Sequence, residues 1–340
     1  MTIAPDFDPD RLTKVLGGPV TLAPVASGQS NPTWFVTCGG REMVLRKKPG
    51  GETAASAHAI DREYRVLSAL ASSGLPIPAM VMMEEDPAVI GTPFYLMERL
   101  HGDVTEDSAL PGVAPEDRRA IYRDAAAVLA RLHRVDWAAV GLSDYGRPGG
   151  YYERQARRWS RQWEATRTRP DPLVDELAAW FADNLPPESP TTIVHGDYRI
   201  GNLMLGLAPA RIAGVLDWEL STLGDPLSDL AHWLMFHAFR PDQMGGLAGL
   251  DLAALGLPSD AELLDHYLAA GGCAAELRPF HRAFALFRMS VILEGITARA
   301  LSGQAAHHDA MAIGALAPEF ARLAAQVLAS DKTLTPARTS

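Results

Sequence analysis

Cysteine is scarce in this sequence. The 340 residues include two cysteines, Cys38 and Cys273, which lie far apart and form no Cys-x-x-Cys pair. A disulfide framework or a cysteine-based zinc site requires more thiols at closer spacing, so neither is expected to organise the fold. This usage is typical of a chain that folds in a reducing compartment, and we expect a cytoplasmic protein.

Positive charge and long apolar runs are also lacking. The formal net charge is -10, which argues against general nucleic-acid binding, because a phosphate backbone requires a basic surface. The beginning of the chain, "MTIAPDFDPDRL", carries acids where a secretion signal would carry bases and an apolar core. No apolar run approaches the roughly 18 residues of a membrane span. We therefore expect neither a nucleic-acid partner nor a membrane partner.

Three common catalytic motifs are absent from the sequence as well. There is no G-x-S-x-G elbow, no G-x-x-x-x-G-K loop and no G-x-G-x-x-G loop. These absences argue against an α/β-hydrolase, a P-loop nucleotidase and a dinucleotide-binding enzyme.

The chain does contain a strand-rich first third followed by a helical remainder. Three short apolar segments alternate with turns between residues 20 and 46, and "PFYLMERL" at 93–100 predicts another strand. Helical periodicity at 57–70 places Ile60, Tyr64, Leu67 and Ala71 on one stripe. Further helices are predicted at 117–133, 151–167, 173–185 and within 228–330, with short strands around 193–205 and 211–219. This distribution predicts an α+β protein with two lobes.

One short segment combines the residues that phosphoryl transfer requires. In "IVHGDYRIGNLML", Asp197 precedes Asn202 by five positions, and Asp217 follows in "VLDWE" at the end of an apolar run. Protein kinases use this order: an Asp that accepts the proton of a hydroxyl, then an Asn and an Asp that hold Mg²⁺ against the phosphates. A lone D-x-x-x-x-N is more often a solvated turn between strands. The combination of His-Gly-Asp, Asn202 and a strand-terminal Asp217 favours the catalytic interpretation.

Features upstream supply the parts of a nucleotide site. The strand "MVLRKK" ends in cations, Arg46 first, and Glu63 borders the apolar stripe of the next helix, so its carboxylate is expected to face inward. A strand cation paired with a helix Glu positions the α- and β-phosphates in kinases. The turn "SGQSN" could cover phosphate oxygens with backbone amides, although an ordinary hairpin turn is the simpler interpretation. The candidate residues of this turn are Ser27, Gly28, Ser30 and Asn31.

Together these residues resemble the aminoglycoside phosphotransferase and choline kinase-like family, which has the protein-kinase-like fold. The resemblance is carried by "GQSNPTWFV", "VLRKKPGG", "SAHAIDREYRVLSAL", "YERQARRWSRQW", "VHGDYRIGNLM", "VLDWELSTLGDPLSDLAH" and "FALFRMSVILEGITARALSG". The similarity is greater still to the branch found as kinase-like domains fused to acyl-CoA dehydrogenases. It implies a bilobal fold, with a nucleotide-binding lobe at residues 1–99 and a catalytic and acceptor-binding lobe at residues 100–340.

The resemblance also implies ATP and Mg²⁺ as cofactors and assigns roles by position. Asp197 corresponds to the catalytic base. The implied metal ligands are Asn202, Asp217 and, through water, Glu219. The implied adenine-binding linker is formed by backbone groups of Met97, Glu98 and Arg99. The residues expected to brace the site are His195, Asp225 and Asp229.

One position departs from the family pattern. Many members have Lys where this chain has Arg46, and Lys47 is its neighbour. Alternation along a strand puts only one of the two on the nucleotide side, and we favour Arg46 because it shares a face with Val44. Arg is a planar fork and Lys a point charge, so nucleotide affinity or the choice between ATP and GTP could differ from the family norm. A nucleotide-binding pseudokinase without turnover is therefore an alternative to an active enzyme.

The acceptor is the least defined part of the prediction. We expect a hydroxylated small molecule, with a hydroxyacyl-CoA as one candidate and an aminoglycoside or another alcohol as the alternative. The helix "YYERQARRWSRQW" is expected to pack through Tyr152, Ala156, Trp159 and Trp163. Its arginines recur at helical spacing, which indicates either a solvated face with ion pairs or a basic patch for an anionic acceptor. These arginines are Arg154, Arg157, Arg158 and Arg161.

Overall fold

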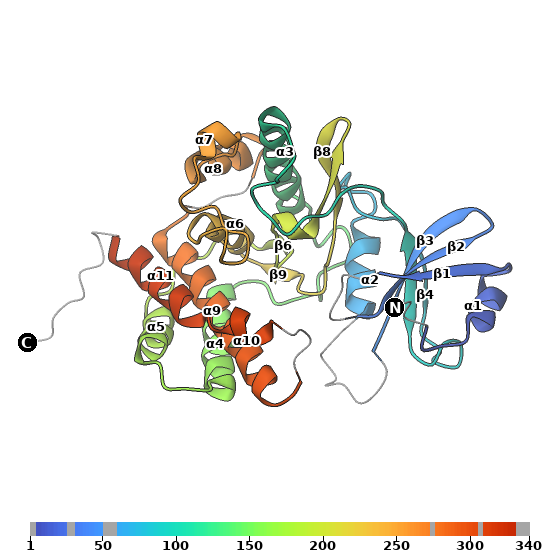
Figure 1. Cartoon of the computed structure of the whole chain (residues 1–340), viewed down its shortest axis with the longest axis horizontal. Helices are drawn as coiled ribbons and strands as arrows, with labels where there is room; N and C mark the ends of the chain where they lie inside the picture. Colours follow the sequence, from blue (N-terminus) through green and yellow to red (C-terminus); the bar gives the residue numbers. More distant parts are fainter. Residues whose placement is uncertain (1–4, 26–30, 50–59, 273–275, 305–308, 331–340) are drawn as a thin grey trace, which may run out of the picture.

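A five-stranded antiparallel sheet forms the N-terminal lobe (Figure 1). The structure is a computed structural model that describes residues 5–25, 31–49, 60–272, 276–304 and 309–330. The strands are β1 (Val20–Pro24), β2 (Thr33–Cys38), β3 (Arg41–Lys47), β4 (Met80–Glu84) and β5 (Phe94–Glu98), in the order β1-β2-β3-β5-β4. Helix α1 (Pro9–Leu16) inserts Leu12 into the core formed by one sheet face, and α2 (Ile60–Ala69) lies between the sheet and the C-terminal lobe.

The predicted strands and the α+β class are confirmed in this lobe, but two elements were not expected. Strand β4 has no alternating pattern, because all of its residues are partly buried, and α1 is a short helix capped by Asp8. The predicted stripe of the following helix was partly wrong. Ile60 and Leu67 are buried, whereas Tyr64 is only partly buried and Ala71 is exposed beyond the helix end.

The C-terminal lobe is mainly helical. Its longer helices are α3 (Pro115–His133), α4 (Tyr151–Thr166), α5 (Pro172–Asp183), α6 (Pro226–Leu234), α8 (Asp260–Ala269), α9 (Pro279–Leu301) and α11 (Ala317–Ser330), with short helices α7 (Leu252–Leu255) and α10 (Ala310–Gly314). Two small antiparallel pairs carry the site, β6 (Thr192–Val194) with β9 (Thr222–Gly224) and β7 (Leu203–Leu207) with β8 (Ala210–Val215). Helix α9 packs against α4, α6 and α11, through a core rich in phenylalanine.

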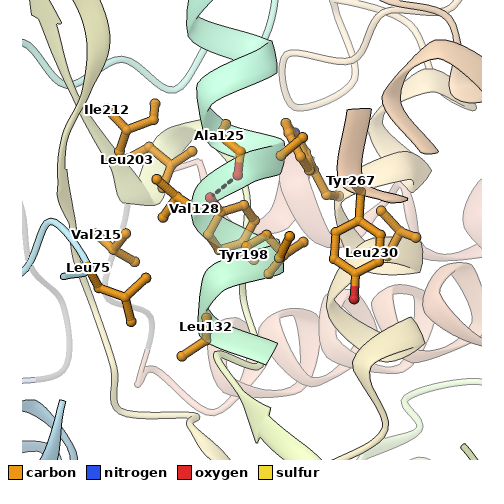
Figure 2. Packing of buried hydrophobic residues seen from close by; sticks show 14 of the residues in the cluster. Leu75, Ala125, Val128, Leu132, Tyr198, Leu203, Ile212, Val215, Leu230 and Tyr267 are labelled. Atoms are coloured by element: carbon orange, nitrogen blue, oxygen red, sulfur yellow. Dashed lines mark hydrogen bonds between the residues drawn. The ribbon is translucent and has the colours of Figure 1, made fainter. Parts of the chain in front are cut away.

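A buried tyrosine anchors the segment between β6 and β7 to helix α3. The Tyr198 hydroxyl donates to the carbonyl oxygen of Ala125 at 2.7 Å, and the side chain is fully buried. Figure 2 shows Tyr198 in one cluster with Val128 of α3 and with Leu203, Ile212 and Val215 of β7 and β8. The apolar flanks recognised in the sequence therefore fix both ends of the segment, while its polar residues are left to form the site.

Residues 310–330 are the single described segment with the length and hydropathy of a membrane span. A core helix passes the same test, so the match is weak support for a membrane location. In the structure α11 buries Ala317, Phe320, Ala321 and Ala324 against its neighbours, and Phe320 lies 4.9 Å from Phe239 between ring centroids.

Candidate active site

The loop that follows β6 is held by a buried carboxylate of helix α6. Asp229 accepts the backbone N–H of His195 at 2.7 Å and that of Gly196 at 2.8 Å, and its side chain is fully buried. Asp225 caps the same helix by accepting the N–H of Leu227 at 2.9 Å. Both acids therefore support the loop structurally, as the sequence predicted.

His195 connects this loop to the strand before Asp217. Its Nδ1 accepts the N–H of Asp197 at 3.3 Å, so its Nε2 carries the proton and donates to the carbonyl of Leu216 at 2.8 Å. Gly196 makes the turn, with φ +86°, and an added Cβ would lie 2.6 Å from the carbonyl oxygen of Leu220. The bracing role expected for His195 is confirmed, and the Gly196 position requires glycine.

The Asp197 carboxylate is held on both oxygens. Its Oδ1 accepts from His232 Nε2 at 2.7 Å, and its Oδ2 accepts from Asn202 Nδ2 at 2.7 Å. Burial opposes the charged form, but the hydrogen bond and charge of His232 and the charges of Arg199 and Arg288 outweigh it and hold the pKa of Asp197 below its usual range. An ionised carboxylate, 26% exposed, is therefore ready to accept a hydrogen bond from a hydroxyl.

His232 is the site residue that sequence reasoning did not assign. It lies on α6, one turn after Asp229, within the quoted stretch "GDPLSDLAH". Burial lowers its pKa, and the hydrogen bond and charge of Asp197 oppose that shift. Its Nδ1 is buried without a partner among the described residues. His232 follows Asp229 by three positions, so the two side chains lie on one face of the helix, and this spacing could have identified His232 from the sequence.

Asn202 and Asp217 are suited to hold a metal ion. Asn202 uses its amide nitrogen on Asp197, which leaves its carbonyl oxygen as a potential ligand, and its backbone oxygen accepts the N–H of Leu216 at 2.8 Å. Asp217 follows with φ 60°, a conformation that is uncommon for a residue with a side chain. Within the described residues, no cluster of three or more His, Cys, Asp or Glu forms a complete metal site. A site with only a few protein oxygens is compatible with Mg²⁺, because this ion usually keeps water molecules and phosphate oxygens among its ligands.

Arg46 connects the two lobes through three carboxylates. Its Nη1 lies 2.8 Å from Glu63 Oε1, and its Nη2 lies 3.1 Å from Asp217 Oδ1 and 3.6 Å from Glu219 Oε2. Burial raises the pKa of Glu63 to about 7, although Arg46 opposes this. The expected pairing of Arg46 with Glu63 is therefore present, and it adjoins the acids predicted to bind metal.

Lys47 points to the other face of the sheet. Its Nζ contacts both carboxylate oxygens of Asp6, at 2.6 and 2.7 Å, and lies 5.4 Å from the centroid of Phe7. The side chain is nearly fully buried there. Strand alternation thus separates the two cations as expected, with Arg46 on the side of the candidate site.

The remaining predicted nucleotide residues are only partly described. Ser27, Gly28 and Ser30 lie outside the described residues, and Asn31 is buried. In the linker, the N–H groups of Glu98 and Arg99 already donate to the carbonyls of Ala79 and Glu42, at 2.8 and 3.3 Å. The Arg99 side chain stacks on Phe35, 3.9 Å from its centroid. An adenine at Met97–Arg99 would therefore have to use the carbonyl groups of this stretch, and that contact stays a prediction.

Comparisons with known proteins agree with this geometry. The sequence profile described as the phosphotransferase enzyme family matches residues 21–284. The chain belongs to this family. A solved structure from Ralstonia eutropha JMP134, which bears the provisional name aminoglycoside phosphotransferase, superposes with a TM-score of 0.87 at 39% identity over 95% of this chain and 99% of that one. The resemblance and the fold expected from the sequence are thereby confirmed.

Other relatives of this family member define the branch. Mouse acyl-CoA dehydrogenase family member 10 is 41% identical over 311 residues, which are 90% of this chain and 29% of that protein. The chain thus spans less than a third of that relative. Viomycin phosphotransferase of Streptomyces vinaceus is 30% identical over 65% of this chain and 70% of its own length. Aminoglycoside phosphotransferase APH(4)-Ia, solved with AMP-PNP and hygromycin B, shares the fold at 20% identity, a TM-score of 0.62, and coverage of 93% and 98%.

The arginines of helix α4 contact different partners in the structure. Arg154 donates to backbone carbonyls before the helix, including that of Arg147 at 2.7 Å, and Arg161 donates to the carbonyl of Arg157 at 3.1 Å. Arg157 pairs with Glu153. Arg158 lies over the Trp159 ring, 5.2 Å from its centroid. The packing stripe is confirmed, since its predicted members Tyr152, Ala156, Trp159 and Trp163 are all buried.

Proposed function

We propose that the chain transfers the γ-phosphoryl group of ATP to a hydroxyl of a small molecule. The observation that carries the proposal is the Asp197 carboxylate, which is ionised, partly exposed and held by His232 and Asn202. The backbone of Asn202 binds Leu216, the residue before Asp217, and Asp217 contacts Arg46. The binding of AMP-PNP and hygromycin B by the related fold of APH(4)-Ia supports a nucleotide and a hydroxylated acceptor here.

The roles of the residues follow from their contacts. Asp197 accepts the proton of the acceptor hydroxyl and orients its oxygen for attack, and His232 and Asn202 keep the carboxylate in position. Asn202 and Asp217 would hold Mg²⁺, which would neutralise charge on the nucleotide phosphates. Arg46, fixed by Glu63, supplies a cation to the phosphates. Glu219, 3.6 Å from Arg46, completes the acidic rim and is suited to bind the metal through water.

We further propose a hydroxyacyl-CoA or a similar hydroxyacyl compound as the acceptor. The support is the identity of 41% to a protein named for acyl-CoA dehydrogenation, whose fused domain would act on an acyl thioester. An aminoglycoside or another small alcohol is the second candidate, supported by the similarity to viomycin phosphotransferase. A pseudokinase is disfavoured, because Asp197, Asn202 and Asp217 all lie in positions that suit turnover.

The proposal is tested by acceptor-dependent release of ADP. Purified protein with Mg·ATP is assayed against hydroxylated metabolites, hydroxyacyl-CoA species and aminoglycosides, and product is identified by mass as acceptor plus phosphate. Omission of Mg²⁺ and of acceptor provide the controls. Stimulation by one acceptor class with a phosphorylated product is expected. Tight Mg·ATP binding without any phosphorylated product would instead indicate a pseudokinase.

A further inference from the structure

Two arginines of the C-terminal lobe form no salt bridge with a described acid, although the charge of one of them, Arg288, helps to lower the pKa of Asp197. Arg158 of α4 and Arg288 of α9 both lie over the Trp159 ring, with their guanidinium carbons 5.2 and 5.5 Å from its centroid. Neither forms an ion pair with a described residue, although the sequence has 41 acids. Burial lowers the pKa of Arg158, and the charge of Arg288 lowers it further. Arg158 is exposed and Arg288 is half-buried, and two neighbouring cations repel one another unless an anion joins them.

Arg288 is fixed directly against the catalytic loop. Its Nη2 donates to the carbonyl of Gly196 at 2.7 Å, one residue before Asp197. Its Nε is buried and has no partner among the described residues. The nucleotide phosphates have a separate cation in Arg46, which contacts Asp217 from the N-terminal lobe. Arg288 and Arg158 belong to the C-terminal lobe, so their charges are available to the acceptor.

We propose that Arg158 and Arg288, supported by Trp159, form a subsite for an oxyanion group of the acceptor whose hydroxyl reaches Asp197. This inference rests on the proposed phosphotransferase function. Guanidinium groups bind carboxylate and phosphate through paired hydrogen bonds, and either group would relieve the repulsion between the two arginines. A polycationic acceptor such as an aminoglycoside would be repelled. Of the four α4 arginines that the sequence offered as candidates for binding an anionic acceptor, only Arg158 is assigned to this subsite.

Equilibrium binding tests the subsite directly, with the nucleotide site filled by Mg·AMP-PNP. Calorimetry compares 3-hydroxybutyryl-CoA, 3-hydroxybutyrate and uncharged 1,3-butanediol in the wild type, Arg158→Ala and Arg157→Ala. Arg157→Ala is the matched control, because this exposed arginine precedes Arg158 on the same helix and pairs with Glu153. We expect Arg158→Ala to weaken binding of an anionic probe about tenfold or more and Arg157→Ala to change it less than about twofold.

The outcomes separate the sources of the oxyanion. A loss confined to 3-hydroxybutyryl-CoA assigns the subsite to phosphate, and a loss for 3-hydroxybutyrate assigns it to carboxylate. Equal affinities in all three proteins, equal losses in both variants, or no binding of either anion by the wild type would overturn the proposal. Arg288→Lys and Arg288→Ala provide a second pair, in which lysine keeps the charge and a donor for Gly196 and should retain more of the anion affinity.

These measurements also distinguish the subsite from the proposed function. Anion binding that depends on Arg158 without any phosphorylated product would leave the subsite in place and refute phosphotransfer. Turnover of an anionic acceptor with the same KM in Arg158→Ala and the wild type would refute the subsite and leave phosphotransfer in place. An increased KM for ATP in Arg158→Ala, with acceptor KM unchanged, would assign the arginine to the nucleotide instead.

Discussion

Adjacent cations on β3 provide a matched test of how the nucleotide is held. Arg46 faces Glu63 and Asp217, at 2.8 and 3.1 Å, whereas Lys47 faces Asp6 on the opposite side of the sheet. Both side chains are largely buried. Arg46→Ala leaves the buried Glu63 without its partner, whereas Lys47→Ala leaves Asp6, which is 58% exposed, and only Arg46→Ala removes a cation from the site.

The expected magnitudes follow from these contacts. Removing one partner of a buried ion pair costs about 3–5 kcal/mol of stability, and Arg46→Ala should fall at the low end because Glu63 can become protonated. The pKa of Glu63 is already raised to about 7 by burial, and loss of the opposing guanidinium raises it further. A charge-assisted hydrogen bond to phosphate contributes roughly 1.5–3 kcal/mol, so Arg46→Ala should raise the Kd for Mg·ATP about ten- to a hundredfold.

Calorimetric titration with Mg·ATP and chemical denaturation measure the two effects separately. Both alanine variants should lose stability, but Lys47→Ala should bind Mg·ATP within about twofold of the wild type. Arg46→Lys should retain part of the affinity, since one cation remains but the fork that reaches both Glu63 and Asp217 is lost. A greater loss of nucleotide affinity in Lys47→Ala than in Arg46→Ala would refute this assignment of the strand faces.

Three further predictions concern the metal, the base and acid stability. Asp217→Ala should abolish the Mg²⁺ dependence of nucleotide affinity, measured by titration with and without the metal; unchanged Mg·ATP affinity would contradict its role. His232→Ala should shift the acid limb of the kcat/KM pH profile to higher pH, because the hydrogen bond of His232 lowers the pKa of Asp197. His232→Gln, which can restore a donor, should show a smaller shift. An acid limb at the same pH in His232→Ala and the wild type would exclude this positioning role. Burial lowers the pKa of His281 to about 4, so its contribution to stability is present above pH 6.5 and is lost as the pH falls toward 4. His281→Asn should reduce the slope of this decline by up to about 1.4 kcal/mol per pH unit. If the wild type and His281→Asn lost stability identically between pH 6.5 and 4, this role of His281 would be excluded.

Much of the catalytic centre could be predicted because its chemistry is local in sequence. The segment from His195 to Asn202 carries the proposed base, the proposed metal-binding amide and the brace of the loop, between apolar flanks that become buried. The inward orientation of Glu63 also followed from one helix, because a carboxylate beside an apolar stripe requires a partner. The strand order and the pairing of β3 with β5 join distant segments, so local patterns in the sequence did not predict them.

The contacts that could not be predicted are those set by packing between helices. His232 reaches Asp197 because α6 lies beneath the loop, and Arg288 reaches Gly196 from α9, more than ninety residues away in the chain. Periodicity placed the arginines of α4 near one another but could not give their partners, which are backbone carbonyls for Arg154 and a glutamate for Arg157. Strand β4 was missed because it is partly buried throughout and shows no alternation.

The most direct test of the central claim is the turnover of Asp197→Asn with the acceptor found by ADP release. Asparagine keeps the size of the side chain but cannot accept the hydroxyl proton as a base. We predict a decrease in kcat on the order of 10²-fold or more, with Mg·ATP affinity within about twofold of the wild type and an unchanged melting profile. Near-normal turnover by a folded Asp197→Asn protein would contradict the assignment of Asp197 as the base and, with it, the mechanism proposed for this site.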